Sequence, residues 1–197
     1  MTLRRKMLTM IPISRPTYFA ARRILSAHET SFRERFHKSS ATMVKVGDTI
    51  PNVELFEGAP DKKVDIGKEL SSGKGLIVTI PAAYSPHCTA SHIPGYIANP
   101  KLKDAGKVFV VSINDPFVMK AWSEQLDPEY KSGIRYLGDV HGELIKALDL
   151  EFDSKAIFGV NRSKRAAIRV QDGKVESFEV EPDNVGVSVT AAEKILA

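Results

Sequence analysis

The sequence predicts an α/β fold, in which helices flank a central mixed sheet, behind an N-terminal segment of different composition. The chain has 197 residues, of which 43% are apolar, and this is enough for one domain with a substantial core. Residues 76–80 and 107–113 are short apolar runs rich in β-branched side chains, which is typical of buried strands. Helix-start and turn residues follow these runs, and this alternation indicates an α/β domain from residue 44 onward.

Local patterns assign the remaining elements of this domain. Pro116 suits the first turn of a helix over residues 116–126. Residues 171–173, Gln-Asp-Gly, separate two strand-like stretches at 165–170 and 174–180, which is a strong hairpin signal. The resulting order of strands and helices is that of a thioredoxin-like fold, although many other α/β domains share this order. The other expected elements are strands at 53–56 and 134–137, a turn at 58–61, and helices at 142–148 and 189–196.

The N-terminal segment, residues 1–40, has the composition of a mitochondrial presequence. It contains nine Lys or Arg against two acidic residues, a net charge of +7, so the rest of the chain is mildly acidic at −3. A helical wheel of residues 18–25 places apolar side chains opposite Arg22 and Arg23. We therefore expect mitochondrial import, with the matrix as destination, and a presequence that is cleaved or disordered. The alternative is a basic arm that touches RNA or anionic lipid. Translation from Met43 would yield a cytosolic form without this segment.

The composition excludes several classes of protein. No stretch approaches the roughly 18 uninterrupted apolar residues of a membrane span, so we expect a soluble protein that does not insert into membranes. The mildly acidic body argues against a nucleic-acid-binding domain, because phosphate neutralisation needs a basic folded surface. The chain has one cysteine, which excludes an internal disulfide and the usual cysteine-based zinc site. Any disulfide must therefore involve a second molecule.

The single cysteine, Cys88, lies just after the expected strand at residues 76–80, and open α/β sheets place their sites at the carboxyl ends of strands. Ser85 is a good N-cap and Pro86 suits the first helical position. Cys88 then falls in the first turn of a helix that runs toward Ala98. A helix start favours negative charge, and the thiolate is the reactive form of cysteine. We interpret Cys88 as a nucleophile, although a cysteine inside a strand would more often be a small buried hydrophobe.

With these residues in view, the chain resembles the peroxiredoxins, in particular the type II, peroxiredoxin-five-like group. The active-site loop of that family reads Pro, Gly or a small residue, Ala, aromatic, Thr or Ser, Pro, any residue, Cys. Residues 81–88 read PAAYSPHC. Residues 91–97 (SHIPGYI), 112–122 (SINDPFVMKAW) and 162–175 (RSKRAAIRVQDGKV) resemble further segments of the family, as does the ending PDNVGVSVTAAEKIL. The resemblance covers residues 44–197.

The resemblance implies a thioredoxin-like domain with thiol-dependent peroxidase activity on hydrogen peroxide and organic hydroperoxides, an antioxidant function that needs no cofactor or metal. Cys88 would attack the peroxide and become a sulfenic acid. Ser85, where the family more often has Thr, would donate to and accept from the reacting groups. Arg165 would supply a permanent, forked positive charge near the thiolate and the breaking O–O bond. Pro81 would shield the thiolate from bulk water.

Other polar and aromatic residues near these motifs have plainer interpretations. Arg162 and Arg169 flank Arg165 in the sequence, and we expect both on solvated surface. His87 occupies a variable position of the family motif and would tune the site at most. Trp122 would contribute packing, next to the arginine or at a dimer surface.

The resemblance is incomplete for the second half of the reaction, in which the sulfenic acid is reduced back to the thiol. Relatives hold a second cysteine either just before the SxNDPF segment, where this chain has Val110, or near the C-terminus, where it has none. The resemblance therefore implies a one-cysteine enzyme whose sulfenic acid is reduced by an external thiol. Glutathione with glutaredoxin, or thioredoxin, are the reductants it offers, and a homodimer is the assembly. A disulfide between the Cys88 residues of two subunits is the remaining alternative.

Two other functions fit the sequence. In a redox sensor or relay, Cys88 would pass its oxidation to a partner protein, and peroxide turnover would be incidental. In a non-enzymatic thioredoxin-fold subunit of a mitochondrial assembly, the domain would have no chemistry. The acidic body and the intact set of Pro, Ser, Cys and Arg favour the peroxidase.

Overall fold

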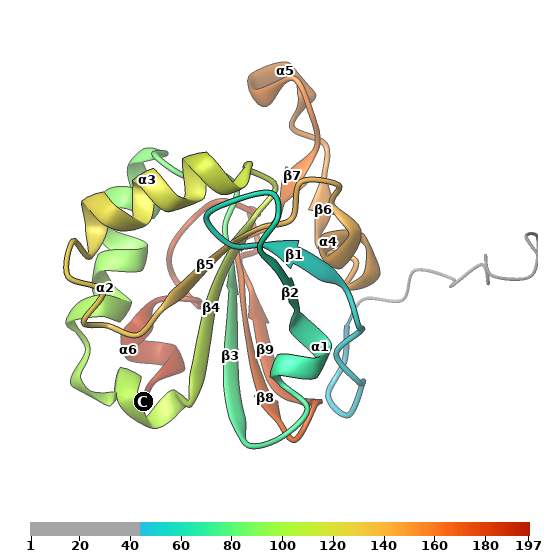
Figure 1. The fold of residues 1–197 in the computed structure, drawn as a ribbon, viewed down its shortest axis with the longest axis vertical. Coiled ribbons are helices and arrows are strands. Elements are labelled where there is room, and N and C mark those ends of the chain that lie inside the picture. Colours follow the sequence, from blue (N-terminus) through green and yellow to red (C-terminus); the bar gives the residue numbers. More distant parts are fainter. Residues whose placement is uncertain (1–43) are drawn as a thin grey trace, which may run out of the picture. The chain divides into compact units, whose positions relative to one another are not determined.

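The computed structural model describes residues 44–197, so the presequence predicted over residues 1–40 and the alternative start at Met43 lie outside the described residues. A seven-stranded mixed sheet of order β2-β1-β5-β4-β3-β8-β9 forms the centre of this part of the chain (Figure 1). Its strands are β1 (Glu54–Phe56), β2 (Lys63–Asp65), β3 (Lys74–Thr79), β4 (Lys107–Ser112), β5 (Arg135–Gly138), β8 (Ala166–Gln171) and β9 (Lys174–Val180). A second sheet pairs β6 (Glu151–Phe152) with β7 (Arg162–Ser163).

The middle of the large sheet is parallel. β3 pairs with β4 and β4 with β5 in the same direction, so the carboxyl ends of all three strands lie at one edge. Leu76 and Val78 face one apolar cluster, Ile77 faces the other, and all three are buried. Because the sheet is covered on both faces, its central strands are continuous apolar runs, which explains why they stand out in the sequence.

β8 and β9 extend the sheet beyond β3 as an antiparallel hairpin. Asp172 and Gly173 in its turn have positive φ angles of 49° and 78°, the geometry that two-residue hairpin turns require. Because β8 runs antiparallel to β3, its first residue, Ala166, pairs with Thr79 at the carboxyl end of β3. The segment that precedes β8 therefore lies at the edge where β3, β4 and β5 end.

Short helices connect the strands. The helical segments of residues 44–197 are α1 (Ile66–Glu69), the π-helix η2 (Cys88–His92), α2 (Ile93–Ala98), the 3-10 helix η3 (Pro100–Ala105), α3 (Pro116–Leu126), α4 (Glu143–Ala147), α5 (Lys155–Phe158) and α6 (Ala192–Ile195). Within this range no helix has the length and apolar character needed to cross a membrane.

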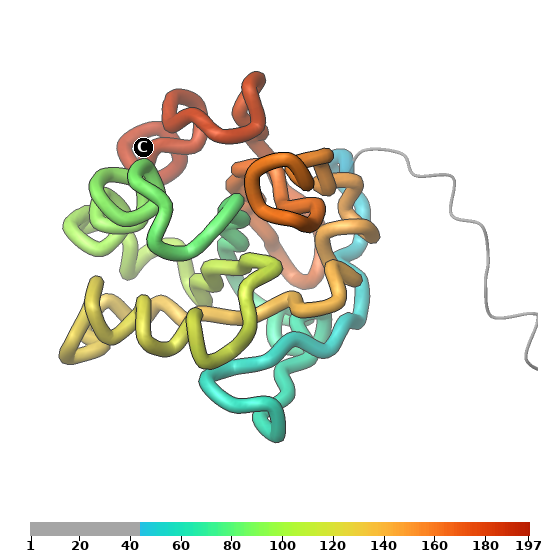
Figure 2. Tube along the Cα trace, turned by 90° about the horizontal axis from the view of Figure 1, so that it is seen from above, coloured from blue at the N-terminus to red at the C-terminus, as the bar shows by residue number. Residues whose placement is uncertain are grey.

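These helices cover the two faces of the sheet (Figure 1). α2, α3 and α6 pack on one face, where Tyr96, Trp122 and Ile195 join its apolar cluster. α1 and α4 pack on the other face through Ile66 and Leu144. α6 lies beside α2, so the C-terminal segment returns to the helix that follows β3 (Figure 2).

The prediction of a thioredoxin-like α/β fold with a mixed sheet is confirmed, and its long elements are close to the observed ones. The helix at residues 116–126 and the strand at 174–180 have the predicted bounds, and the expected strands at 76–80 and 107–113 are present as β3 and β4. β2, α1, β6, α5 and β7 have no counterpart in the sequence prediction. Each contains two to four residues, which is too short for a hydrophobic period to show.

Candidate active site

The loop after β3 leads directly into the helix that carries Cys88. The Ser85 carbonyl accepts a hydrogen bond from the Thr89 N–H at 3.0 Å, so helical bonding begins around Pro86, and Cys88 lies in the first turn as predicted. The following turn is wider than an α-helix, because the Ile93 N–H donates to the Cys88 carbonyl five residues back. The predicted capping bond from the Ser85 side chain is not found among the hydrogen bonds of residues 44–197, and His87, which directly precedes the π-helix, makes no side-chain cap either.

A neighbouring loop holds this segment in place. The Asn114 side-chain oxygen, at the end of β4, accepts hydrogen bonds from the Ala83 N–H at 3.0 Å and from the Ser112 hydroxyl at 2.8 Å. Tyr84, between the loop and the helix, has a φ of 62°, a conformation that costs energy for a residue with a side chain. The loops after β3 and β4 are thus joined at the edge where both strands end.

Arg165 reaches Cys88 from the segment just before β8. The Thr79 hydroxyl donates to the Lys164 carbonyl at 2.8 Å, which fixes this segment to the end of β3. The Arg165 Nη1 donates to the Cys88 Sγ at 3.3 Å. Cys88 is 0% exposed and Arg165 is 1% exposed, so the sulfur and the guanidinium meet away from bulk water. This contact joins two residues that are 77 positions apart in the sequence.

The guanidinium of Arg165 is held by neutral acceptors. Its Nε and Nη2 donate to the Val185 carbonyl at 3.1 and 2.9 Å, and its Nη1 also donates to the His92 Nδ1 at 2.9 Å. In residues 44–197 no carboxylate forms an ion pair with it. A buried positive charge that is oriented but not paired with a carboxylate remains available to a negative sulfur or oxygen beside it.

His92 connects Arg165 to the C-terminal segment. Its Nε2 lies 3.1 Å from the Thr190 carbonyl, which can only accept, so Nε2 carries the proton and Nδ1 accepts from Arg165. Burial and the nearby Arg165 charge lower the pKa of His92 to about 3. His92 is therefore neutral near pH 7 and serves as an acceptor for the guanidinium. The Tyr96 hydroxyl donates to the same Thr190 carbonyl at 2.7 Å.

The structure brings two of the predicted site residues, Cys88 and Arg165, into hydrogen-bond contact, whereas Pro81 and Ser85 form no hydrogen bond with either. Pro81 is buried in the loop after β3, and Ser85 is half-buried with a hydroxyl that makes no hydrogen bond in the described chain. His87 is exposed at the helix start. Trp122 is fully buried and donates its Nε1 to the Thr89 hydroxyl at 3.1 Å, so it packs against the Cys88 helix.

The expectation that Arg162 and Arg169 lie on solvated surface is wrong, because both side chains are half-buried. Arg162 stacks over the Phe158 ring, with its guanidinium carbon 5.0 Å from the ring centre. The sequence pattern shows the charge of Arg162 and Arg169, but it does not show the aromatic ring beside the first or the cavity that the second lines.

Four groups around Arg165 were not predicted from the sequence. They are the carbonyls of Val185 and Thr190 and the side chains of His92 and Tyr96. The two carbonyls have no residue-type signal, since every residue carries one. His92 could have been noticed, because it lies four positions after Cys88 on the same helix.

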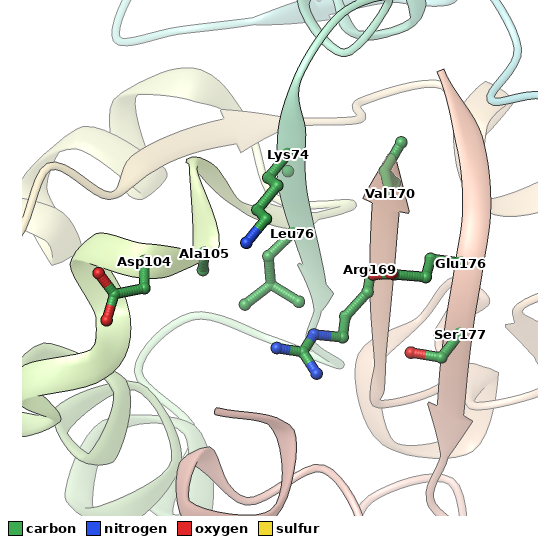
Figure 3. Close-up of a pocket in the computed structure, with 9 residues that line it drawn as sticks. Lys74, Leu76, Asp104, Ala105, Arg169, Val170, Glu176 and Ser177 are labelled. Atoms are coloured by element: carbon green, nitrogen blue, oxygen red, sulfur yellow. The ribbon is translucent and has the colours of Figure 1, made fainter. Parts of the chain in front are cut away.

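A separate cavity of about 190 Å³ lies at the other end of the sheet, where β3 begins and β8 ends (Figure 3). Lys74 and Arg169 point into it, and Ser177 lines it from β9. Cys88 follows the opposite end of β3, so this cavity is not part of the site. Residues 44–197 contain no group of His, Cys, Asp or Glu side chains that could hold a metal ion.

Comparison with known proteins identifies the family. Residues 45–196 match the family model described as Redoxin. The chain is 40% identical over 158 residues to the peroxisomal membrane associated protein 20 of Schizosaccharomyces pombe, covering 79% of this chain and 99% of that protein. It is 38% identical over 133 residues to the mitochondrial peroxiredoxin-2F of Oryza sativa subsp. japonica, covering 66% of each.

Solved structures agree with this assignment. Reduced Prx3 from Vibrio vulnificus in complex with hydrogen peroxide has a TM-score of 0.71 at 35% identity, with 78% of this chain and 94% of that one covered. Peroxiredoxin 5 from Alvinella pompejana has a TM-score of 0.66 at 38% identity, with 75% and 96% covered. The matched region contains the whole Cys88 site, and the chain belongs to the peroxiredoxins, a family of thiol-dependent peroxidases.

Proposed function

We propose that Cys88 is the nucleophile that reduces hydrogen peroxide and organic hydroperoxides. The observation that carries this assignment is the 3.3 Å contact between the Arg165 Nη1 and the Cys88 Sγ, in a site where both residues are buried. The thiolate sulfur attacks the hydroxyl oxygen of the peroxide, so an S–O bond forms while the O–O bond breaks. The sulfur is oxidised by two electrons to a sulfenic acid, and the departing alkoxide or hydroxide takes up a proton.

In this proposal Arg165 stabilises charge at both ends of the reaction. Before attack, its guanidinium stabilises the negative sulfur. During attack, negative charge moves to the departing oxygen, and a fixed donor in a dry site stabilises that charge without having to reorient. The Val185 and His92 acceptors support this role because they orient the guanidinium without neutralising it.

Pro81 and Ser85 have supporting roles in the proposal. Pro81 is buried in the loop that precedes the Cys88 helix and keeps bulk water from the sulfur. The Ser85 hydroxyl has no partner in the described chain, so it is free to donate to, and accept from, a peroxide above Cys88.

Stopped-flow mixing with hydrogen peroxide and with an organic hydroperoxide tests this assignment, with Trp122 fluorescence and intact mass as readouts. We expect one oxygen to be added per protein, on Cys88. A protein that turns over peroxide with Cys88 blocked by alkylation would contradict it.

We further propose that an external thiol completes the cycle through a mixed disulfide. Cys88 is the only cysteine of the chain, and Val110, where some relatives hold a second thiol, is fully buried in β4. One glutathione thiolate would displace water from the sulfenic acid, and a second thiol would then release Cys88 and carry the disulfide away. Glutathione with glutaredoxin, or thioredoxin, are the candidate reductants.

The reductant is identified by offering glutathione, glutaredoxin and thioredoxin separately after one equivalent of peroxide. With glutathione, intact mass should show one adduct of about 305 Da on Cys88. With excess peroxide and no thiol, the mass should increase by about 32 Da and activity should be lost. A covalent dimer as the sole product with glutathione present would contradict the mixed disulfide and favour a bond between two Cys88 residues.

The location follows from the two parts of the chain. We propose that residues 1–40 are a mitochondrial presequence and that residues 44–197 form the peroxidase domain. The basic composition of the segment and two mitochondrial peroxiredoxin-2F relatives support import, whereas a peroxisomal relative supports another destination. Import into isolated mitochondria with shortening of the chain would support the proposal, and uptake by peroxisomes alone would contradict it.

We propose that the domain forms a homodimer through the surface beside the active-site loop. Phe117, at the start of α3, is 61% exposed and Tyr84, in the loop, is 48% exposed, so a second copy would remove two large apolar side chains from water. Light scattering should give a dimer mass, and Phe117→Glu should give a monomer. A parent protein that stays monomeric at high concentration would contradict this assembly.

A further inference from the structure

Backbone carbonyls from one irregular segment hold Arg165, which contacts the Cys88 sulfur, and His92, which accepts from Arg165. The Val185 carbonyl accepts two hydrogen bonds from Arg165, and the Thr190 carbonyl lies 3.1 Å from the His92 Nε2. Both carbonyls belong to residues 181–190, which connect β9 to α6 and are neither strand nor helix. Regular secondary structure therefore does not fix the positions of these two carbonyls, so other interactions must fix them.

Two carboxylates hold this segment. Asp183 forms a local turn, because it accepts from the N–H groups of Val185 at 3.1 Å and Gly186 at 2.7 Å. The longer span, up to Thr190, is closed by Glu181. Its Oε1 accepts hydrogen bonds from the Ser188 N–H at 2.7 Å, the Thr190 N–H at 2.8 Å and the Thr190 hydroxyl at 2.7 Å, and its Oε2 accepts from the Ser188 hydroxyl at 2.6 Å. The Glu181 N–H donates to the Arg165 carbonyl at 3.0 Å, and the Arg165 N–H donates to the Asn184 carbonyl at 2.8 Å. The segment is thus closed into a loop around one carboxylate and is tied to the backbone of Arg165.

The Glu181 carboxylate is buried, with 2% exposure, yet it is charged. Burial alone would raise the pKa of Glu181, but the hydrogen bonds from Ser188 and Thr190 outweigh it and lower the pKa to about 2. None of its four donors is a cation. The negative charge of Glu181 therefore does not contact the Arg165 guanidinium. It holds the loop whose carbonyl accepts from the guanidinium, and it forms no ion pair that would neutralise that charge.

We propose that Glu181 is a positioning residue for peroxide reduction. By closing the loop, it places the Val185 and Thr190 carbonyls so that Arg165 stays directed at the Cys88 sulfur. This inference rests on the roles proposed above for Cys88 and Arg165.

The alternative is that Glu181 only stabilises the fold, and two reactions of Cys88 separate the two roles. Alkylation by iodoacetamide needs a reachable thiolate but breaks no O–O bond. Reaction with peroxide needs the thiolate and also a guanidinium placed at the departing oxygen. If Glu181 acts by placing Arg165, its replacement lowers the peroxide rate more than the alkylation rate. A loss of stability alone would leave the ratio of the two rates unchanged.

The experiment compares Glu181→Gln and Glu181→Ala with the parent chain. Glutamine keeps one acceptor oxygen and can donate to the Ser188 hydroxyl, so we expect the second-order rate with peroxide to fall by roughly three- to tenfold. Alanine opens the loop, and misplacement of the guanidinium should lower the rate by roughly 10- to 100-fold. Circular dichroism verifies folding, and the glutamine variant carries the test if the alanine variant does not fold.

Asp127→Asn is the matched control. The Asp127 carboxylate is also buried, at 7% exposure, and also anchors a loop, because it accepts from the N–H groups of Lys131 at 3.0 Å and Ser132 at 2.9 Å. That loop precedes β5, at the end of the sheet away from Cys88. The control should lower the melting temperature and leave the ratio of peroxide to alkylation rates at the parental value.

A double-mutant cycle completes the test. If Glu181 acts through the guanidinium, Glu181→Gln should cost clearly less in an Arg165→Lys background than in the parent. Additive effects, or a Glu181→Gln variant with the same rate ratio as Asp127→Asn, would overturn the inference. A parent chain that does not react with peroxide, or an Arg165→Lys variant with the parental rate, would instead overturn the proposed function.

Discussion

The segment that carries β8 directs one arginine toward each end of the sheet, and the structure holds the two differently. Arg165 is 1% exposed, and the Val185 carbonyl, His92 and the Cys88 sulfur accept from its guanidinium. Arg169, four residues later, points into an open cavity (Figure 3), and its guanidinium has no hydrogen bond or ion pair within the described residues. The charge is the same, but only the restrained guanidinium is positioned to stabilise a reacting group. Chemical use therefore depends on the acceptors around an arginine more than on its charge.

The largest effect on peroxide reduction should come from replacing Cys88, whose sulfur lies at the Arg165 end of the sheet and has no counterpart at the Arg169 end. Cys88→Ser replaces the proposed nucleophile by a hydroxyl of similar size, which is far less reactive near pH 7, so peroxide reduction should be abolished. Peroxide consumption under steady state measures this, with thermal unfolding as the control for the fold. Residual turnover above that of buffer would show that another group attacks the peroxide.

Arg165→Lys and Arg169→Lys compare the two arginines directly. Lysine keeps the charge but lacks the planar fork, so Arg165→Lys should slow oxidation by roughly 100-fold, the scale expected for a lost transition-state donor. Arg169→Lys should leave the rate within about twofold, as is usual for a substitution away from the site. Stopped-flow oxidation of both variants gives the answer, and equal losses would remove the distinction between the two ends.

His92→Gln tests the neutral acceptor that only the Arg165 end has. Because the pKa of His92 is about 3 in the folded chain and about 6.5 when unfolded, below pH 6.5 the unfolded state binds a proton that the folded state does not. The parent chain should therefore lose stability as the pH falls from 6.5 toward 3, by about 2 kcal/mol at pH 5 from this residue. Urea unfolding at pH 7 and pH 5 should show a smaller loss for His92→Gln. Equal losses would mean that His92 is not held neutral.

Ser85→Ala should have a smaller effect at the same end. Its hydroxyl makes no hydrogen bond in the described chain, so the fold should be unaffected, while the loss of one donor to the peroxide should slow oxidation by roughly three- to tenfold. Oxidation kinetics at one fixed pH provide the measurement. A parental rate would remove Ser85 from the proposed site.

The smallest effect should come from removing the N-terminal segment, because the described contacts of both arginines lie within residues 44–197. A chain that begins at Met43 retains all the described residues, including both ends of β8 and the C-terminal loop. We expect unchanged oxidation kinetics and cooperative unfolding. Loss of cooperative unfolding would show that residues 1–42 belong to the folded domain.

Much of the fold could be predicted from the sequence because its central strands are buried on both faces. β3 and β4 appear as apolar runs, α3 has Pro116 at its start, and the turn at Asp172 and Gly173 has residues that tolerate positive φ. Strands of two or three residues, such as β6, depend on tertiary contacts and give no period. The order of the strands within the sheet and the direction of each pair were not predicted, because they depend on contacts between segments that are distant in the sequence.

The pair of residues at the centre of the candidate site was more predictable than the groups that hold the arginine in place. Cys88 and Arg165 could be named because the first is unique and the second lies in a motif of the family. The groups that hold the arginine could not be named. The Val185 carbonyl and the neutral His92 become its acceptors, and the Thr190 carbonyl becomes the partner of His92, only after the C-terminal segment returns to α2. Arg162 and Arg169 were assigned to solvated surface because a charge pattern does not show the Phe158 ring beside the first or the cavity walls around the second.

The Cys88 sulfur has no exposed surface, so molecules of different size reach it at different rates. A hydroperoxide needs space for a few atoms, whereas a reducing thiol brings a peptide or a whole protein with it. In the proposed cycle, the covering side chains would therefore have to move further for reduction than for oxidation, and the rate of that opening would limit the lifetime of the sulfenic acid. A second peroxide can enter during that lifetime. In the proposed cycle, the same closed packing that favours the first reaction would therefore also lengthen the time that Cys88 spends oxidised.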